Sequence, residues 1–142
     1  MQRPVNVILG FMLLLGTLPS VHAEEDEWKR LDAKAEALSN KGQFDQALLV
    51  ENKALALAEK TRGPNHPDVA TSLDGLGMIQ TQQGHYAQAE ASFQRELAIR
   101  EKALGPKDPS VENALDRLGM LAYYQPQYSH PFFWAPFSVI GE

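Results

Sequence analysis

The sequence predicts an all-α fold in which paired helices stack into a short solenoid, followed by an irregular or extended tail. The first observation is an internal repeat, because segment 42–78 returns 42 residues later as segment 84–120. Glycines and prolines recur in register at Gly42/Gly84, Gly63/Gly105, Gly77/Gly119, Pro64/Pro106 and Pro67/Pro109. The second observation is helical spacing of the apolar residues within each copy. A fixed period of this size is typical of repeat architectures, in which each unit covers its apolar face only against its neighbours.

Segment 1–23 is predicted to be a secretory signal peptide. Arg3 precedes an apolar run at 5–18, and Val21 and Ala23 supply small residues at positions −3 and −1 of a cleavage site after Ala23. The prediction is therefore an exported protein, periplasmic or secreted. A membrane-anchoring helix is the alternative, but the run falls short of the ~20 residues that span a bilayer, so no membrane contact is expected after cleavage.

The chain after residue 23 has the length of one domain and an acidic composition. Of the 13 Lys and Arg residues in the full sequence, only Arg3 lies in the predicted signal peptide, which we call the leader. The remaining chain therefore carries 12 Lys and Arg against 18 Asp and Glu. An acidic chain without a basic stripe is a poor partner for nucleic acid or for an anionic membrane. The chain has no cysteine, so an exported form has neither disulfides nor a thiol nucleophile and depends on packing for its stability.

Five helices are expected between residues 24 and 125, which makes about two and a half helix–turn–helix units. Their expected spans are 24–40, 44 up to the turn at 61–64, 67–83, 86–104 and 109–124. Pro67 and Pro109 suit the first position of a helix, and Asp108 is expected to cap the last one. Small residues are expected to let neighbouring helices come close at the equivalent positions Ala35, Gly77 and Gly119.

The repeated pattern G-[QH]-[FY]-x-Q-A, followed by K-x-x-G-P-x-x-P-x-V-x-x-x-L-D-x-L-G-M, resembles the 42-residue tetratricopeptide repeat (TPR) of the kinesin-light-chain type. The match covers about residues 28–124. The resemblance implies a non-enzymatic adaptor that binds a peptide or a protein. Two positions depart from the family pattern and are expected to weaken local packing: Gln80 replaces an aromatic residue and Glu96 replaces alanine.

The same resemblance places the first helix of each unit along a concave groove where extended peptides bind. The ligand-binding positions carried over are Asp32, Thr71, Asp74, Met78, Asn113, Asp116, Met120 and Tyr123. The aspartates would then stack one per repeat beside methionines that adapt to varied apolar groups. Such a groove suits a peptide with a basic or amide-rich face. The alternative is a solvated acidic face without a partner, since charge on an exposed helix usually needs none.

The tail at 126–142 carries a second resemblance. Its last fourteen residues, S-H-P-F-F-W-A-P-F-S-V-I-G-E, are similar to the closing segment of CHAT domains, which are caspase-like and often follow such repeats in bacteria. That chemistry needs a His and a Cys, and the chain has no Cys, so no catalytic residue is carried over. The tail thus suggests the hypothesis of a shortened, catalytically inactive relative of a TPR–CHAT protein.

Three alternatives stay open for the tail. The last helix lacks a following partner, which is expected to leave Leu118, Leu121 and Ala122 uncovered. The aromatic residues of the tail could fold back over this face, pair with another chain as a homo-oligomer, or belong to a disordered gene remnant. The interface residues in the second case are Phe132, Phe133, Trp134 and Phe137.

No motif for catalysis, cofactor binding or metal binding stands out in the sequence. It lacks a glycine-rich phosphate loop and a nucleophile–base pair, so no enzyme and no cofactor is expected. His66 and His85 fall in turns without a second histidine at ligand spacing. Helices in contact lie ~8–10 Å apart, which places aspartates of successive units too far apart to share an ion. The expected function is protein or peptide binding.

Overall fold

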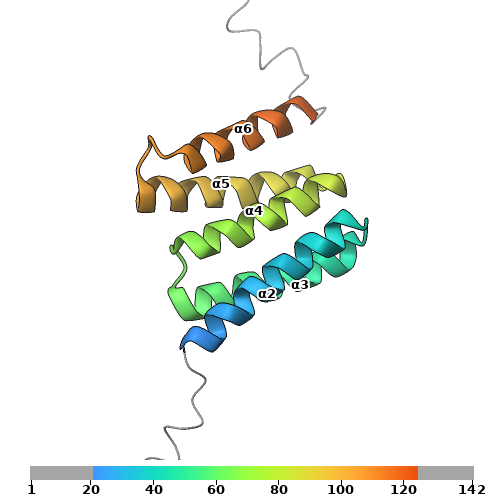
Figure 1. The fold of residues 1–142 in the computed structure, drawn as a ribbon. Coiled ribbons are helices and arrows are strands. Elements are labelled where there is room, and N and C mark those ends of the chain that lie inside the picture. Colours follow the sequence, from blue (N-terminus) through green and yellow to red (C-terminus); the bar gives the residue numbers. More distant parts are fainter. Residues whose placement is uncertain (1–20, 125–142) are drawn as a thin grey trace, which may run out of the picture.

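The computed structural model describes residues 21–124 and forms five helices and no strand over that range. The helices are α2 (Val21–Asn40), α3 (Phe44–Arg62), α4 (Pro67–Gln82), α5 (Tyr86–Leu104) and α6 (Pro109–Tyr124). Figure 1 shows them stacked in one direction, with α2 and α3 at one end and α6 at the other. Consecutive helices contact one another, and α2 also contacts α4. The predicted all-α solenoid is confirmed.

Two predicted segments lie outside the described residues. They are the leader, apart from residues 21–23, and the tail, with its aromatic residues Phe132, Phe133, Trp134 and Phe137. The predicted cleavage site after Ala23 falls at the start of α2, which begins three residues before the expected helix. The other boundaries agree to within one residue, since α4 ends at Gln82 instead of residue 83.

The helix ends follow the turn chemistry expected from the sequence. Gly63 after α3 and Gly105 after α5 have φ values of 91° and 88°, in the left-handed region that glycine adopts without steric cost. At the start of α6, Asp108 Oδ1 accepts a hydrogen bond from the Ser110 backbone N–H at 2.9 Å, so the expected cap is confirmed. These helices therefore begin and end through local chemistry that both repeats share.

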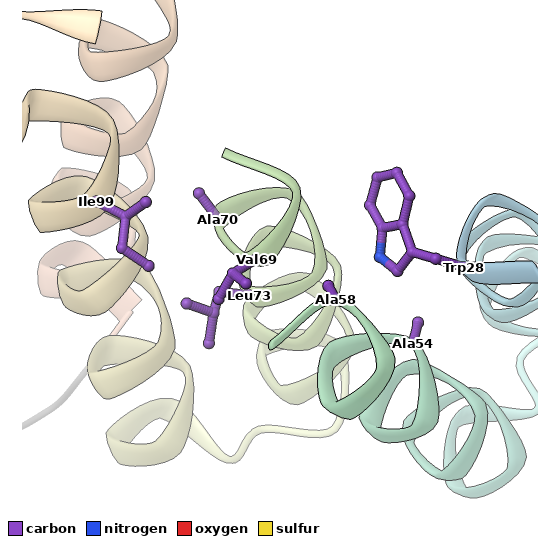
Figure 2. Close-up of a cluster of buried hydrophobic side chains, with 7 residues drawn as sticks. All are labelled: Trp28, Ala54, Ala58, Val69, Ala70, Leu73 and Ile99. Carbon is purple, nitrogen blue, oxygen red and sulfur yellow. The ribbon is translucent and has the colours of Figure 1, made fainter. Parts of the chain in front are cut away.

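A cluster of buried apolar residues joins four helices (Figure 2). Its members are Trp28 of α2, Ala54 and Ala58 of α3, Val69, Ala70 and Leu73 of α4, and Ile99 of α5. The Trp28 indole N–H donates to Ser72 Oγ at 2.9 Å, so the one polar atom of this ring is satisfied inside the core. The cluster therefore holds two successive units together.

Helices α4 and α5 pack tightly at Gly77. A Cβ placed on Gly77 would lie 2.4 Å from Phe93 Cε1, and Phe93 is 1% exposed. The expectation that a small residue at this position admits a neighbouring helix is therefore confirmed. The equivalent Gly119 is exposed, and a Cβ there would meet no heavy atom within 4 Å in the described part of the chain.

One expectation for α6 is wrong. Leu121 is 2% exposed because it packs on α5 with Ala89 and Phe93, and Leu118 is partly buried against the same cluster. Ala122 is exposed as expected. The uncovered apolar surface instead includes Leu115, which is 50% exposed and equivalent to the buried Leu73. The helical period turns Leu121 toward α5 and Leu115 toward the side where a further helix would lie.

Replacing the two glycines provides a matched test of this packing. Gly77→Ala is expected to lower the free energy of unfolding by about 1–3 kcal/mol, because the added methyl group has no space beside Phe93. Gly119→Ala is expected to leave it unchanged or raise it by up to ~1 kcal/mol, since alanine has the higher helix propensity. Urea unfolding followed by circular dichroism measures both, and equal effects would contradict the close approach at Gly77.

Candidate functional site

Helices α2 and α4 enclose a hollow of about 330 Å³, with one further side chain reaching it from α3. We call it the acidic pocket. Its lining residues are Asp32, Glu36, Ser39 and Asn40 of α2, Glu51 of α3, and Thr71, Asp74, Gly75, Met78, Ile79 and Gln82 of α4. Four of the groove positions predicted from the sequence, Asp32, Thr71, Asp74 and Met78, are thus brought together.

Two hydrogen bonds tie the walls of the acidic pocket to each other. Near one end, the Trp28 indole N–H donates to Ser72 Oγ at 2.9 Å. Near the other end, Ser39 Oγ donates to Gln82 Oε1 at 2.7 Å. Both bonds join α2 to α4, and Asp32 and Asp74 lie between them along the two helices. The width of the pocket is therefore fixed at both ends.

The predicted positions on α6 lie elsewhere. Asn113, Asp116, Met120 and Tyr123 are all exposed, and none of them lines the acidic pocket. Met120 lines a separate, small apolar hollow between α4 and α6, which it shares with Met78. Asp32 and Asp74 therefore face one pocket while Asp116 does not, so the three aspartates do not converge.

A buried carboxyl, Glu51, is the pocket residue that the sequence analysis missed. It is 1% exposed, and its Oε1 has no hydrogen-bond partner. Glu51 occupies space left by Gly75, where a Cβ would lie 3.0 Å from Glu51 Cδ. The signal was present in the repeat, because Glu51 aligns with Phe93 one period later. A carboxyl group at the position of a core aromatic residue marks an unusual site.

Burial controls the charge of this carboxyl. Burial raises the pKa of Glu51 to about 8, and the nearby carboxylate of Asp32 adds to this rise. A hydrogen bond from the Ser72 hydroxyl acts in the opposite direction. The pKa of Asp32 is also raised, first by burial and then by repulsion from Glu36. The pocket thus holds carboxyl groups that resist simultaneous ionisation.

Arg117 is a second residue near the pocket that the sequence did not predict, and it neutralises Asp74. Its Nη1 pairs with Asp74 Oδ1 from α6 to α4 and lies 4.0 Å from Glu96 Oε1. Its guanidinium carbon also lies 6.0 Å from the centre of the Phe93 ring. Burial lowers the pKa of Arg117. Asp74 therefore belongs to a structural ion pair at the edge of the pocket.

The two departures from the family pattern both have polar partners. Glu96 is 1% exposed and accepts from Arg100 Nε of its own helix at 2.8 Å. Burial raises the pKa of Glu96, and the bond to Arg100 partly offsets this rise. Gln80 Oε1 accepts from Ser92 Oγ at 2.9 Å. Gln80 and one oxygen of Glu96 therefore have polar partners, whereas Glu96 Oε2 has none in the described part of the chain.

Two other kinds of site are not formed by residues 21–124. No group of three or more His, Asp or Glu side chains is placed to hold a metal ion in this range. Within the same limits, no helix is long and apolar enough to cross a membrane. His66 instead has a local role, because its Nδ1 accepts from the Asp68 backbone N–H at the start of α4.

Comparison with known families agrees with the geometry. A tetratricopeptide repeat model matches residues 30–102, which is just over half of the chain. The chain therefore belongs to the tetratricopeptide repeat family. Repeats of this family mediate protein–protein interactions, which supports a protein partner and an adaptor or scaffold role. The all-α fold of tetratricopeptide repeats is typically non-enzymatic. No curated protein matches the sequence.

The charge of Glu51 predicts a pH-dependent stability. Because the folded pKa of about 8 exceeds the unfolded value, the folded state binds this proton more tightly, and stability falls as pH rises from about 4.5 through 8. Glu51→Gln removes this loss. We expect the variant to exceed the wild type in unfolding free energy by about 2–5 kcal/mol at pH 9, with a much smaller difference at pH 4.

Urea unfolding at a series of pH values measures this difference. Glu112→Gln serves as the control, because Glu112 is exposed on α6 and outside the pocket. Its difference from the wild type is expected to stay within about 0.5 kcal/mol at every pH. A pH-independent effect of Glu51→Gln would contradict the buried, protonated state of Glu51.

Proposed function

We propose that this protein is an exported, non-enzymatic adaptor that binds a peptide or protein segment along the concave groove of α2, α4 and α6. The observation that carries the proposal is the acidic pocket, a hollow of about 330 Å³ in a fold whose repeats mediate protein interactions. The small hollow between α4 and α6 extends the surface, since Met78 lines both. An extended peptide running across α2, α4 and α6 would contact the two hollows in turn.

The chemistry of the groove suits a peptide. Met78 and Met120 are 42% and 55% exposed, and their flexible thioethers adapt to varied apolar side chains. Asn40 and Gln82 add amide groups to the pocket lining, and amides can both donate to and accept from a peptide backbone. The groove thus offers apolar contact and backbone hydrogen bonding side by side, which are the two requirements for binding an extended segment.

A charged residue in the groove is expected to abolish peptide binding. The test screens the purified full chain against a library of random nonapeptides with acetylated and amidated ends. Met78→Arg places a bulky charge between the two hollows and is expected to reduce peptide capture at least tenfold. Leu49→Arg is the matched control, because Leu49 is 60% exposed on α3 and lines neither hollow. Equal capture by both variants would refute groove binding.

Export is supported by the leader-like segment 1–23. We expect mass spectrometry of the protein from a bacterial host to give Glu24 as the first residue, and fractionation to place it outside the cytoplasm. Ala23→Arg is expected to block this processing, because the position before the cut requires a small residue. An uncleaved wild-type chain recovered from the cytoplasm would contradict the proposal.

The finer class within the family is proposed to be the kinesin-light-chain-like one. Its support is the 42-residue period, because two glycines that lie 42 residues apart have nearly the same backbone conformation. Gly63 and Gly105 have φ values of 91° and 88° and ψ values of 160° and 159°. The TPR–CHAT relic remains the alternative proposal, supported by the tail motif. A longer gene copy with repeats, a His/Cys block and the same ending would favour it, whereas relatives of uniformly short length would count against it.

A second candidate function is self-association through α6 and the tail. The favouring observation is the uncovered surface of α6, where Leu115 is 50% and Tyr123 is 86% exposed. If this surface pairs with another chain, light scattering of the full chain is expected to give twice the monomer mass. Leu115→Glu is expected to restore the monomer, with Glu112→Gln as a control. A wild-type monomer at high concentration would exclude this candidate.

A further inference from the structure

We propose that the acidic pocket is a specificity site for one basic side chain, Lys or Arg, of the bound peptide. This inference rests on the proposed peptide-binding function and names the chemistry that the groove selects. Glu51 and Asp32 would receive the cationic group, and Met78 and Ile79 would contact its aliphatic stem. Carboxyl groups and apolar side chains both line the pocket, which matches the two halves of a long basic side chain.

The carboxyl of Glu51 has an unsatisfied oxygen. The side chain is 1% exposed, and Oε1 has no hydrogen-bond partner although it is buried. Leaving such an acceptor unpaired is unfavourable, because the group loses its hydration without a replacement. A cationic donor reaching into the pocket would remove this cost and add a charge-assisted hydrogen bond.

The fold does not require a carboxyl at this position. One period later the equivalent residue is Phe93, which is buried against Gly77 and is part of the apolar core. The repeat architecture is therefore built with an aromatic ring here. Glu51 replaces that ring in the unit that forms the pocket and adds a buried carboxyl group to the pocket lining.

The charge balance of the pocket also favours a cation. Asp32, Glu36 and Glu51 line it without any Lys, Arg or His among the lining residues. Asp74 also lines it, but Arg117 already neutralises that carboxylate. The remaining carboxyls raise one another's pKa values, as Asp32 does for Glu51 and Glu36 does for Asp32. A bound cation would relieve this repulsion.

Glu96 provides a contrast within the same chain. Both carboxyls are 1% exposed, and each has one oxygen without a hydrogen-bond partner in the described part of the chain, Oε1 of Glu51 and Oε2 of Glu96. Glu96 differs because its Oε1 accepts a hydrogen bond from Arg100 Nε of its own helix at 2.8 Å. The corresponding position one turn after Glu51 is Leu55, which brings no charge. The chain therefore supplies an internal cation to one buried carboxyl and leaves a hollow beside the other.

The size of the hollow favours a side chain over a bare ion. At about 330 Å³, the hollow is many times larger than the space that one water molecule needs. The carboxyls of residues 21–124 form no metal-binding group. A Lys or Arg side chain can enter such a space together with water and brings its own donors, so this occupant suits the pocket better than a metal ion.

The test uses nonapeptide pools with acetylated and amidated ends and a single fixed central residue. The fixed residue is Lys, Arg, norleucine or citrulline. Norleucine keeps the aliphatic stem of Lys without its charge, and citrulline keeps the shape of Arg without its charge. The full chain is expected to bind the Lys or Arg pools at least tenfold more tightly than the neutral pools. Glu51→Gln is expected to reduce this preference at least fivefold while binding of the norleucine pool is retained.

The control variant is Glu112→Gln, which also removes one carboxylate but is exposed on α6 and lines neither hollow. It is expected to keep the full preference, which separates a specific site from general attraction to an acidic protein. If the wild type binds all pools equally, or if Glu51→Gln keeps the preference, the specificity site is wrong and the proposed function survives. If the wild type binds no pool, the proposed function itself fails.

A second readout monitors the proton on Glu51. Ionisation of Glu51 on binding a Lys peptide at pH 7 is expected to release a proton, so the calorimetric enthalpy should differ between phosphate and Tris buffers. The groups facing Glu51 are Asp32 and Glu36 of α2 and Asp74 of α4, with Arg117 paired to the last. The buffer difference is expected to vanish in Glu51→Gln, and an equal difference in both proteins would refute the role of Glu51.

Discussion

The rest of the structure depends on the packing of α2 against α3 and α4 around Trp28. This side chain is part of the cluster that joins four helices, and its N–H bonds to Ser72 inside that cluster. The same bond fixes α2 relative to α4 and therefore sets the walls of the acidic pocket. The contact between α2 and α4 therefore contributes both to the core and to the walls of the acidic pocket.

Two buried glutamates show how a repeat can keep its fold while its units diverge. Glu96 stands where the preceding unit has Ala54, and Glu51 stands where the following unit has Phe93. Arg100 compensates the first within one helix. The second has hydrogen-bonding neighbours in Ser72 and Asp32, but it has no cation beside it, its Oε1 lacks a hydrogen-bond partner, and the residue lines a hollow. A buried carboxyl without a cation beside it favours its protonated form, so the second site is the one where a cationic ligand would stabilise the carboxylate.

Helices α4 and α6 occupy equivalent positions in the sequence repeat but differ in how their residues are buried. Leu73 is 4% exposed, whereas Leu115, one period later, is 50% exposed. The Phe93 ring of α5 packs against Gly77 so closely that a Cβ there would overlap it. A Cβ on Gly119 would meet no heavy atom of residues 21–124 within 4 Å. In a solenoid each unit is stabilised only by its neighbours, so the same residue is core or surface according to whether another helix packs against it.

The sequence by itself determined the all-α repeat, the helix boundaries to within three residues and the Asp108 cap. These features result from local hydrogen bonding and from the helical period, which neighbouring residues encode. The placement of Asp32, Thr71, Asp74 and Met78 on one groove was implied by the resemblance to tetratricopeptide repeats, and the packing of α2 against α4 brings them together. Only the tertiary structure decided that Leu121 is buried, that Arg117 pairs with Asp74, and that Glu51 lines the pocket while Asp116 does not. Each of these depends on contact with a side chain of another helix. The hydrophobic period of a single helix contains no information about how far that side chain lies from it.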